Sequence, residues 1–134
     1  MKVKTKFKAF TLPELLIVLV IIGILVLLAL PRLMPLISKA KSTEAQLQLS
    51  HLHMLQKNYF YLHSRYSEDF DALGFEQEKL VTNEGSANYK IEIVNADHAG
   101  FLARATAVVD FDGDGQYNVW EIDENKKLIE VTKD

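Results

Sequence analysis

Residues 8–32 read KAFTLPELLIVLVIIGILVLLALPR, and Glu14 is the only charged residue between Ala9 and Pro31. An uncharged apolar run of this length is long enough to cross a lipid bilayer as a helix. A carboxylate inside such a helix costs a few kcal/mol, so it marks a functional position and needs a partner. The run therefore predicts a membrane-spanning helix in which Glu14 has a role beyond anchoring.

The basic residues around this run are distributed unevenly. Lys2, Lys4, Lys6 and Lys8 precede it, whereas Arg32 alone follows it closely. The positive-inside rule places the side richer in lysine and arginine in the cytoplasm. We therefore expect a cytoplasmic N-terminus and export of everything after Arg32.

The start of the run, AFTLPELL at residues 9–16 behind a short basic leader, resembles the prepilin peptidase site of the type IV pilin superfamily. This superfamily includes pilus subunits, type II secretion pseudopilins and competence pilins. The resemblance covers about the first quarter of the chain. It implies that prepilin peptidase removes residues 1–9 by cutting between Ala9 and Phe10, and that the new amino group of Phe10 is methylated. It also implies that Glu14 pairs with the Phe10 amino group of a neighbouring subunit during filament assembly.

Two residues depart from the usual pattern of that family. Ala9 stands where glycine is usual, and Pro13 stands where an aliphatic residue is usual. In a helix that continued from the leader, the ring of Pro13 would clash with the carbonyl of Ala9. After cleavage, Pro13 lies among the first residues of the helix, whose N–H groups have no helical partner in any case. Pro13 therefore favours the cleaved helix.

A secretory signal peptide and a plain membrane anchor are the competing interpretations of this segment. The apolar run is long for a signal peptide, and the small residue Ala29 leads into Pro31 and Arg32 without a small-x-small cleavage site. A plain anchor accounts for the length of the run but gives no reason for Glu14 or Pro13.

The composition fits one small exported domain behind one helix. The chain has 134 residues, of which 49% are hydrophobic, and it has no cysteine, so no disulfide can hold its C-terminal region. Four of the 15 basic and one of the 18 acidic residues precede Arg32, which leaves a net charge of −6 on the rest. That charge argues against binding to the phosphate backbone of nucleic acids.

The period of the apolar residues changes along the exported part. Residues 32–66 show the three-and-four spacing of a helix, with Pro31 and Pro35 as expected points of interruption. Residues 88–94 and 100–108 alternate as strands do, and shorter strands are expected at 117–122 and 127–131. We interpret one further set of side chains as core between helix and head: Tyr59, Tyr61, Tyr66, Phe70, Leu73 and Phe75.

The predicted fold class is α+β. A long N-terminal helix spans the membrane with its first half, residues 10–31, and continues through residues 32–66 outside it. A loop and a small antiparallel sheet of three to four strands, within residues 67–134, pack on this second half.

Residues 110–121, DFDGDGQYNVWE, fit the calcium-loop pattern D-x-D-x-D-G-x5-E. Ca²⁺ takes six to eight oxygen ligands. The spacing would supply carboxylates from Asp110, Asp112 and Asp114, and further oxygens from the Gln116 carbonyl and Glu121. Both flanks are predicted strands, however, and Asp-Gly pairs are also common in hairpin turns without a metal. Calcium binding and an ordinary hairpin turn therefore both remain open.

Enzymatic activity is not predicted. His51 and His53 point to different sides of a helix, and His63 and His98 have no partner at ligand spacing. The chain has no cysteine nucleophile, no glycine-rich phosphate loop, and no nucleophile placed with a histidine and an acid.

The resemblance implies a structural subunit of a type IV pilus or of a type II secretion pseudopilus. Such a subunit waits in the bacterial inner membrane as a single-pass protein and then joins a periplasmic or extracellular filament. Its partners would be prepilin peptidase, an inner-membrane assembly platform, further copies of itself and other pilin-like subunits. The alternative is a membrane-anchored, calcium-binding exported domain that does not polymerise.

Overall fold

The structure is a computed structural model that describes residues 9–134. Of the predicted leader, residues 1–8 lie outside this range. The chain divides into two compact units, Met1–Met34 and Pro35–Asp134. The second unit, Pro35–Asp134, is the head.

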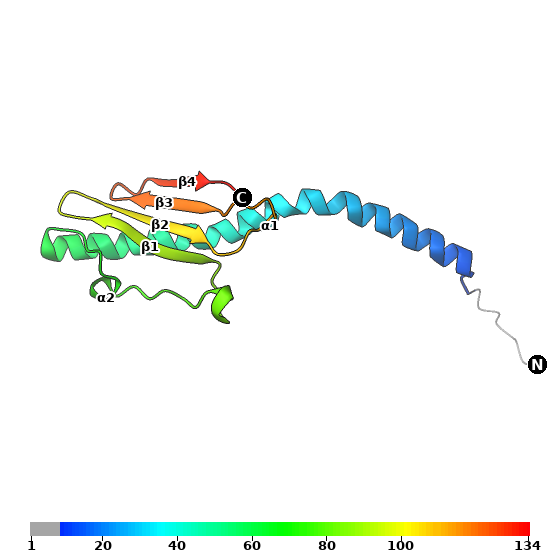
Figure 1. The fold of residues 1–134 in the computed structure, drawn as a ribbon, viewed down its shortest axis with the longest axis horizontal. Coiled ribbons are helices and arrows are strands. Elements are labelled where there is room, and N and C mark those ends of the chain that lie inside the picture. The colour runs from blue at the N-terminus through cyan, green and yellow to red at the C-terminus, as the bar shows by residue number, and fades with distance from the viewer. Residues whose placement is uncertain (1–8) are drawn as a thin grey trace, which may run out of the picture. The chain divides into compact units, whose positions relative to one another are not determined.

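The predicted long helix is confirmed as α1 (Leu12–His63), a single helix of 52 residues (Figure 1). It ends three residues before Tyr66, where its predicted end lay, because Ser64 adopts a left-handed φ of 56° that no helix continues through. The expected interruption at Pro31 and Pro35 was wrong, since α1 runs through both. A proline removes one helical hydrogen bond, and the leucine-rich turns on either side keep the remaining ones.

The N-terminal part of α1 carries the apolar run. Within the described part of the chain, this run is long and apolar enough to cross a membrane, and none of it is buried. Leu19 and Leu28, for example, each expose more than 60% of their surface. So large an apolar surface is rare on a soluble protein and indicates contact with lipid or with another protein.

The predicted antiparallel sheet is confirmed with four strands: β1 (Tyr89–Ala96), β2 (Phe101–Ala107), β3 (Val119–Asp123) and β4 (Leu128–Thr132). The strands pair in chain order, each antiparallel to the next. Figure 1 shows the sheet lying along the later turns of α1, as expected for an α+β head. β1 and β4 form the two edges.

β2 carries the centre of the core. Its side chains alternate between buried and partly exposed, as predicted for a half-buried strand. The buried ones are Phe101, Ala103, Ala105 and Ala107. They join one cluster with Ala45, Leu49 and Leu52 on α1. Three of the four buried β2 side chains are alanine, and these small side chains leave room for the leucines of the helix.

The segment between α1 and β1 holds the short helix α2 (Phe70–Leu73) and the 3₁₀ turn η1 (Val81–Asn83). Most of the predicted aromatic core is confirmed, with Tyr66, Leu73 and Phe75 buried. Tyr61 was wrongly included, since 79% of its surface is exposed. Two positions along a helix turn a side chain by about 200°, which directs Tyr61 away from the face that Tyr59 shares.

A buried polar group joins the two edges of the sheet. Asn118 is fully buried just before β3, and its Oδ1 accepts a hydrogen bond of 2.7 Å from the Tyr89 hydroxyl. Its Nδ2 donates to Glu130 Oε1 at 2.7 Å and to the Thr132 carbonyl at 3.0 Å. Burial raises the pKa of Tyr89, so its phenol stays protonated and keeps donating. The amide thus links β1 to β4 without a covalent bond.

Replacing Asn118 by leucine should destabilise the head. The change leaves the buried Tyr89 hydroxyl without a partner, at about 1–3 kcal/mol, and removes the hydrogen bond to the half-buried Thr132 carbonyl. Urea unfolding of residues 35–134, followed by the fluorescence of the single tryptophan, Trp120, measures the loss. Asn58→Leu, on an exposed position of α1, is the matched control and should change stability little. Equal midpoints for the two variants would contradict a structural role for Asn118.

Candidate functional site

The predicted processing site lies at the start of the described chain. Ala9 and Phe10 are exposed and precede the helix, and Phe10 exposes 75% of its surface. The peptide bond between them therefore lies in an accessible, non-helical segment.

Glu14 has a hydrogen-bond partner within its own chain. The Thr11 N–H donates to Glu14 Oε2 at 3.0 Å, and the Thr11 carbonyl accepts the first helical bond from Leu15 at 3.2 Å. This is half of a capping box, in which a residue in the first turn satisfies the N–H of the residue before the helix. The Thr-x-x-Glu spacing of residues 11–14 is a sequence signal for this arrangement.

Pro13 already lies at the start of the helix in the uncut chain, and its preference for the cleaved form stays a prediction. α1 begins at Leu12 while Ala9 is still present, so Pro13 already lies in the first turn and clashes with no helical carbonyl. Pro13 is therefore compatible with the chain before and after cleavage.

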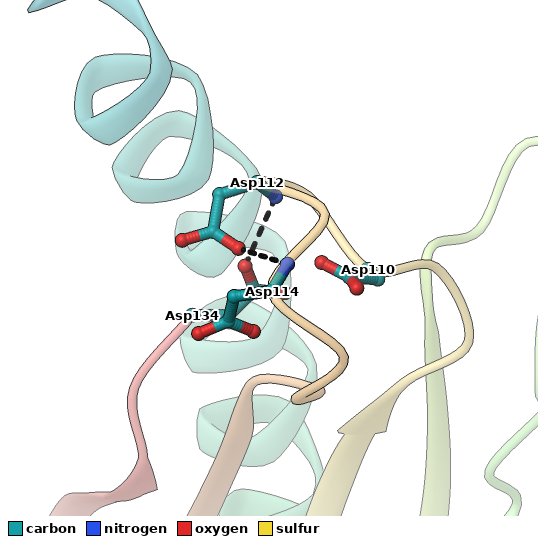
Figure 2. Close-up of side chains that lie close together, drawn as sticks. All are labelled: Asp110, Asp112, Asp114 and Asp134. Atoms are coloured by element: carbon teal, nitrogen blue, oxygen red, sulfur yellow. Dashed lines mark hydrogen bonds between the residues drawn. The ribbon is translucent and has the colours of Figure 1, made fainter. Parts of the chain in front are cut away.

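The acidic loop between β2 and β3 gathers carboxylates. Carboxylate oxygens of Asp110, Asp112, Asp114 and Asp134 all lie within 4.8 Å of one another (Figure 2). Three of these four residues are predicted ligands. Asp134 comes from the segment after β4, and nothing in the local motif marks it, because only the fold brings it to the loop.

Hydrogen bonds within the loop set its shape. Asp110 accepts from the N–H groups of Gly113 at 2.6 Å and Gly115 at 2.7 Å. Asp112 accepts from Asp114 N–H at 3.0 Å. Both glycines have a φ of at least 80°, a conformation that favours glycine. The loop therefore folds around its own carboxylates.

Asp134 attaches the loop to the rest of the head. Its side chain accepts from the N–H groups of Phe111 at 2.9 Å and Asp112 at 3.1 Å. Its backbone carbonyl accepts from the hydroxyl of Ser38, a buried residue on α1, at 2.5 Å. The loop is thereby connected both to the segment after β4 and to the helix.

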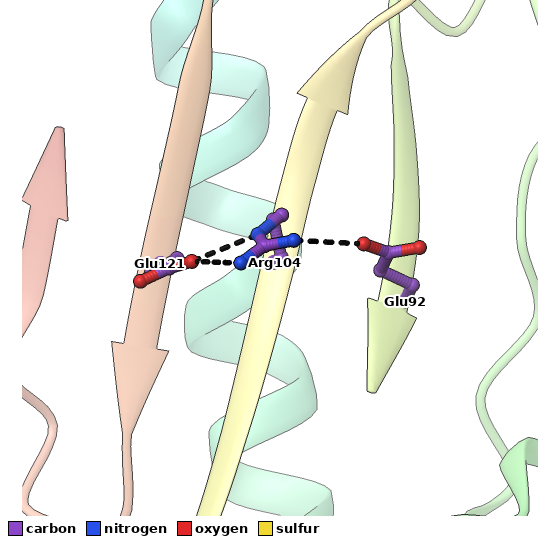
Figure 3. A network of polar contacts seen from close by, with 3 residues as sticks. All are labelled: Glu92, Arg104 and Glu121. Carbon is purple, nitrogen blue, oxygen red and sulfur yellow. Dashed lines mark hydrogen bonds and ion pairs between the residues drawn. The ribbon is translucent and has the colours of Figure 1, made fainter. Parts of the chain in front are cut away.

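One of the predicted ligands lies away from the acidic loop. Glu121 is on β3, outside the cluster, where it pairs with Arg104 Nη2 at 2.7 Å and accepts from Arg104 Nε at 2.8 Å (Figure 3). Arg104 also contacts Glu92 on β1 at 3.5 Å. In an EF-hand a helix returns the twelfth residue to the ion, and here a strand occupies that position. Gln116 stays in the loop, where its N–H donates to Asp114 at 2.7 Å.

The loop perturbs the pKa values of two of its carboxyl groups in opposite directions. The N–H groups of Gly115 and Gly113 lower the pKa of Asp110 and hold it ionised. At Asp112 the N–H of Asp114 acts to lower the pKa, but partial desolvation and the neighbouring carboxylates outweigh it, so the pKa of Asp112 is raised. Negative charge is thus concentrated where a cation would relieve it.

The residues present fit a hard divalent cation. All four side chains offer carboxylate oxygens, the donors that Ca²⁺ prefers. Each oxygen that accepts one N–H keeps a second lone pair. The same bonds organise the loop by themselves, so its geometry also suits an ordinary turn.

Comparison with known proteins finds a family motif near the N-terminus and a pilin relative. Residues 4–30 match the family model of the prokaryotic N-terminal methylation motif. The type IV major pilin protein PilA of Myxococcus xanthus (strain DK1622) is 39% identical to this chain over 72 residues. These residues make up 54% of this chain and 33% of the pilin, so the chain matches about a third of the length of that relative. The motif and the pilin relative both support the resemblance of this chain to the type IV pilin superfamily.

Proposed function

We propose that the chain is a structural subunit of a type IV pilus or of a type II secretion pseudopilus. One observation carries the proposal: the methylation motif stands at the start of a helix that is apolar enough to cross a membrane and has no buried residue in that apolar window. A surface of this kind requires lipid before assembly and other subunits after it. The superfamily is one of structural proteins, and no catalytic activity is proposed.

The chemistry of assembly would depend on two groups one turn apart. Cleavage between Ala9 and Phe10 creates an amino group, which N-methylation leaves cationic at neutral pH. Among the described residues, only one oxygen of Glu14 has a hydrogen bond, the one from Thr11. The other can pair with the Phe10 amino group of a neighbouring copy. In an apolar filament core, each of these charges would be costly without the other.

The order of events follows from the charge distribution. The lysine-rich leader would keep the N-terminus cytoplasmic, where prepilin peptidase cuts, and the head would be exported. The subunit would then wait in the inner membrane and join the filament at an assembly platform, together with its own copies and other pilin-like subunits.

Processing predicts a defined N-terminus. The mature protein should begin at Phe10, carry one added methyl group and lack residues 1–9. Intact-mass measurement of membrane-extracted protein, with N-terminal sequencing, would detect this. An N-terminus at Met1, or one beyond Pro31, would contradict the processing proposal.

Replacement of Glu14 separates its two possible roles. Glu14→Gln keeps an oxygen to accept from the Thr11 N–H but removes the charge, whereas Glu14→Leu removes both. Both variants should insert and be processed, and both should lose most of their filament yield, measured by shearing and immunoblotting. Normal yield from Glu14→Gln with low yield from Glu14→Leu would mean that capping of α1, not charge pairing, is the role of Glu14.

We also propose that the acidic loop binds Ca²⁺, with Asp134 in the place predicted for Glu121. The meeting of Asp134 with the three loop aspartates favours this over the hairpin-turn interpretation. A membrane-anchored, calcium-binding domain that does not polymerise would use the same loop, and filament yield distinguishes it from the pilin proposal.

Calcium should therefore stabilise the head. A ligand that binds only the folded state adds about 2.7 kcal/mol at a hundredfold excess over Kd. Melting of residues 35–134 in millimolar Ca²⁺ and in chelator measures the effect. Asp112→Asn and Asp134→Asn should abolish the shift, and Glu121→Gln should retain it. The same shift in all four proteins, or none in the parent, would assign the loop to an ordinary turn.

The loop should also respond to pH without metal. The pKa of Asp110 is lower in the folded state than in the unfolded state, so its ionised carboxylate stabilises the head at pH values above the unfolded-state pKa. This stabilisation is lost as the pH falls through the folded-state pKa. Ionisation of Asp112 has the opposite effect on the stability of the head, because its raised pKa means that the ionised form is unfavourable in the folded state. The amide NMR signals of Gly113 and Gly115 should report the Asp110 titration at a lower pH than Asp114 N–H reports that of Asp112. Asp110→Asn should remove the first titration only.

A further inference from the structure

The two edges of the sheet differ in how they are covered. β4 pairs with β3 on one side. Within residues 9–134, no group beyond β3 and the preceding Asn118 hydrogen-bonds to the backbone of β4. An uncovered strand edge presents unpaired N–H and C=O groups and is a template for pairing with another chain.

The β4 edge is apolar at its centre and basic at its ends. Ile129 and Val131 expose 43% and 51% of their surfaces. The exposed lysines Lys126, Lys127 and Lys133 flank them, and the ion pairs among the described residues include none of the three. The acids of this segment are engaged elsewhere, Glu130 by Asn118 and Asp134 by the loop.

The opposite edge is covered at its start by the chain itself. The Gln77 side chain donates to the Tyr89 carbonyl at 3.2 Å and accepts from Ile91 N–H at 2.7 Å, so it occupies the hydrogen-bonding groups of the first residues of β1. The charged residues around Gln77 are exposed, and three of the four are acidic. They are Glu76, Glu78, Lys79 and Glu84, with Val81 36% exposed among them.

We infer that residues 76–81 of one copy of this chain lie alongside β4 of the next copy. Apolar Val81 would meet Ile129 and Val131, and Glu76 and Glu78 would meet the lysines at the ends of β4. Both surfaces belong to the same chain and lie on opposite edges of one sheet, so the contact is head-to-tail and repeats in an open array. The inference rests on the proposed function and names the surfaces through which neighbouring heads meet.

Engineered cysteines test this contact in assembled filaments, and the chain has no cysteine to interfere. Filaments of a Glu78→Cys, Ile129→Cys double variant, after mild oxidation, should give a ladder of dimers, trimers and larger species on a non-reducing gel. Either single variant should stay monomeric. A Glu78→Cys, Val94→Cys pair is the matched control, because Val94 is exposed on β1 and not on β4. Filaments of the double variant without a ladder, or an equal ladder from the control pair, would overturn the inference.

A charge exchange provides a second test. Lys127→Glu with Lys133→Glu should lower filament yield severalfold, and adding Glu76→Lys with Glu78→Lys should restore most of it. Unchanged yield in the first variant, or no recovery in the second, would count against the contact. Failure of the parent chain to form filaments would overturn the proposed function and this inference with it, whereas filaments that fail these two tests overturn the inference alone.

Discussion

The head depends on the packing of α1 side chains against β2. Ala103 and Ala105 are completely buried beneath the helix, and Leu49 and Leu52 fill the space that these small side chains leave. A larger residue at either alanine would push the helix away from the strand, at about 1–3 kcal/mol for an overpacked site. The other strands are placed through β2, because β1 and β3 pair with it directly and β4 pairs with β3.

Polar contacts complete what this small core begins. Glu44 on α1 accepts from the backbone and side-chain N–H groups of Asn88, both at 2.8 Å, and so holds the start of β1. Asn118 and Asp134 hold the end of the chain in the same manner. Each such bond contributes about 0.5–1.5 kcal/mol, so a few of them together match the usual contribution of one disulfide. A chain without cysteine can thus secure its C-terminal region by distributing the task over several side chains.

Much of this architecture could be predicted because it depends on local periodicity. The helical spacing in residues 32–66 and the alternation in β1 and β2 are properties of neighbouring residues. Asp134 could not be predicted as a partner of Asp110, since their approach depends on the path of β4. Glu121 fits the spacing of the calcium-loop motif, but it lies on the strand predicted at residues 117–122, which keeps its side chain out of the loop. The hydrogen bond between Thr11 and Glu14 can be predicted from the sequence, because it follows from the local spacing of a capping box.

The contact of Arg104 with Glu92 and Glu121 bears on how the sheet finds its alignment. Arg104 lies on β2 between partners on β1 and β3 (Figure 3). If β2 slipped by one residue, its side chains would change faces, and the guanidinium would enter the alanine-lined core without a counter-charge. The ion pairs therefore favour the observed register of β1, β2 and β3 over a register shifted by one residue. β4 lacks such a bridge among the described residues, and its alignment rests on its turn and on Asn118. Thermal opening of the head should accordingly begin at β4 and leave the other three strands aligned for rapid closure.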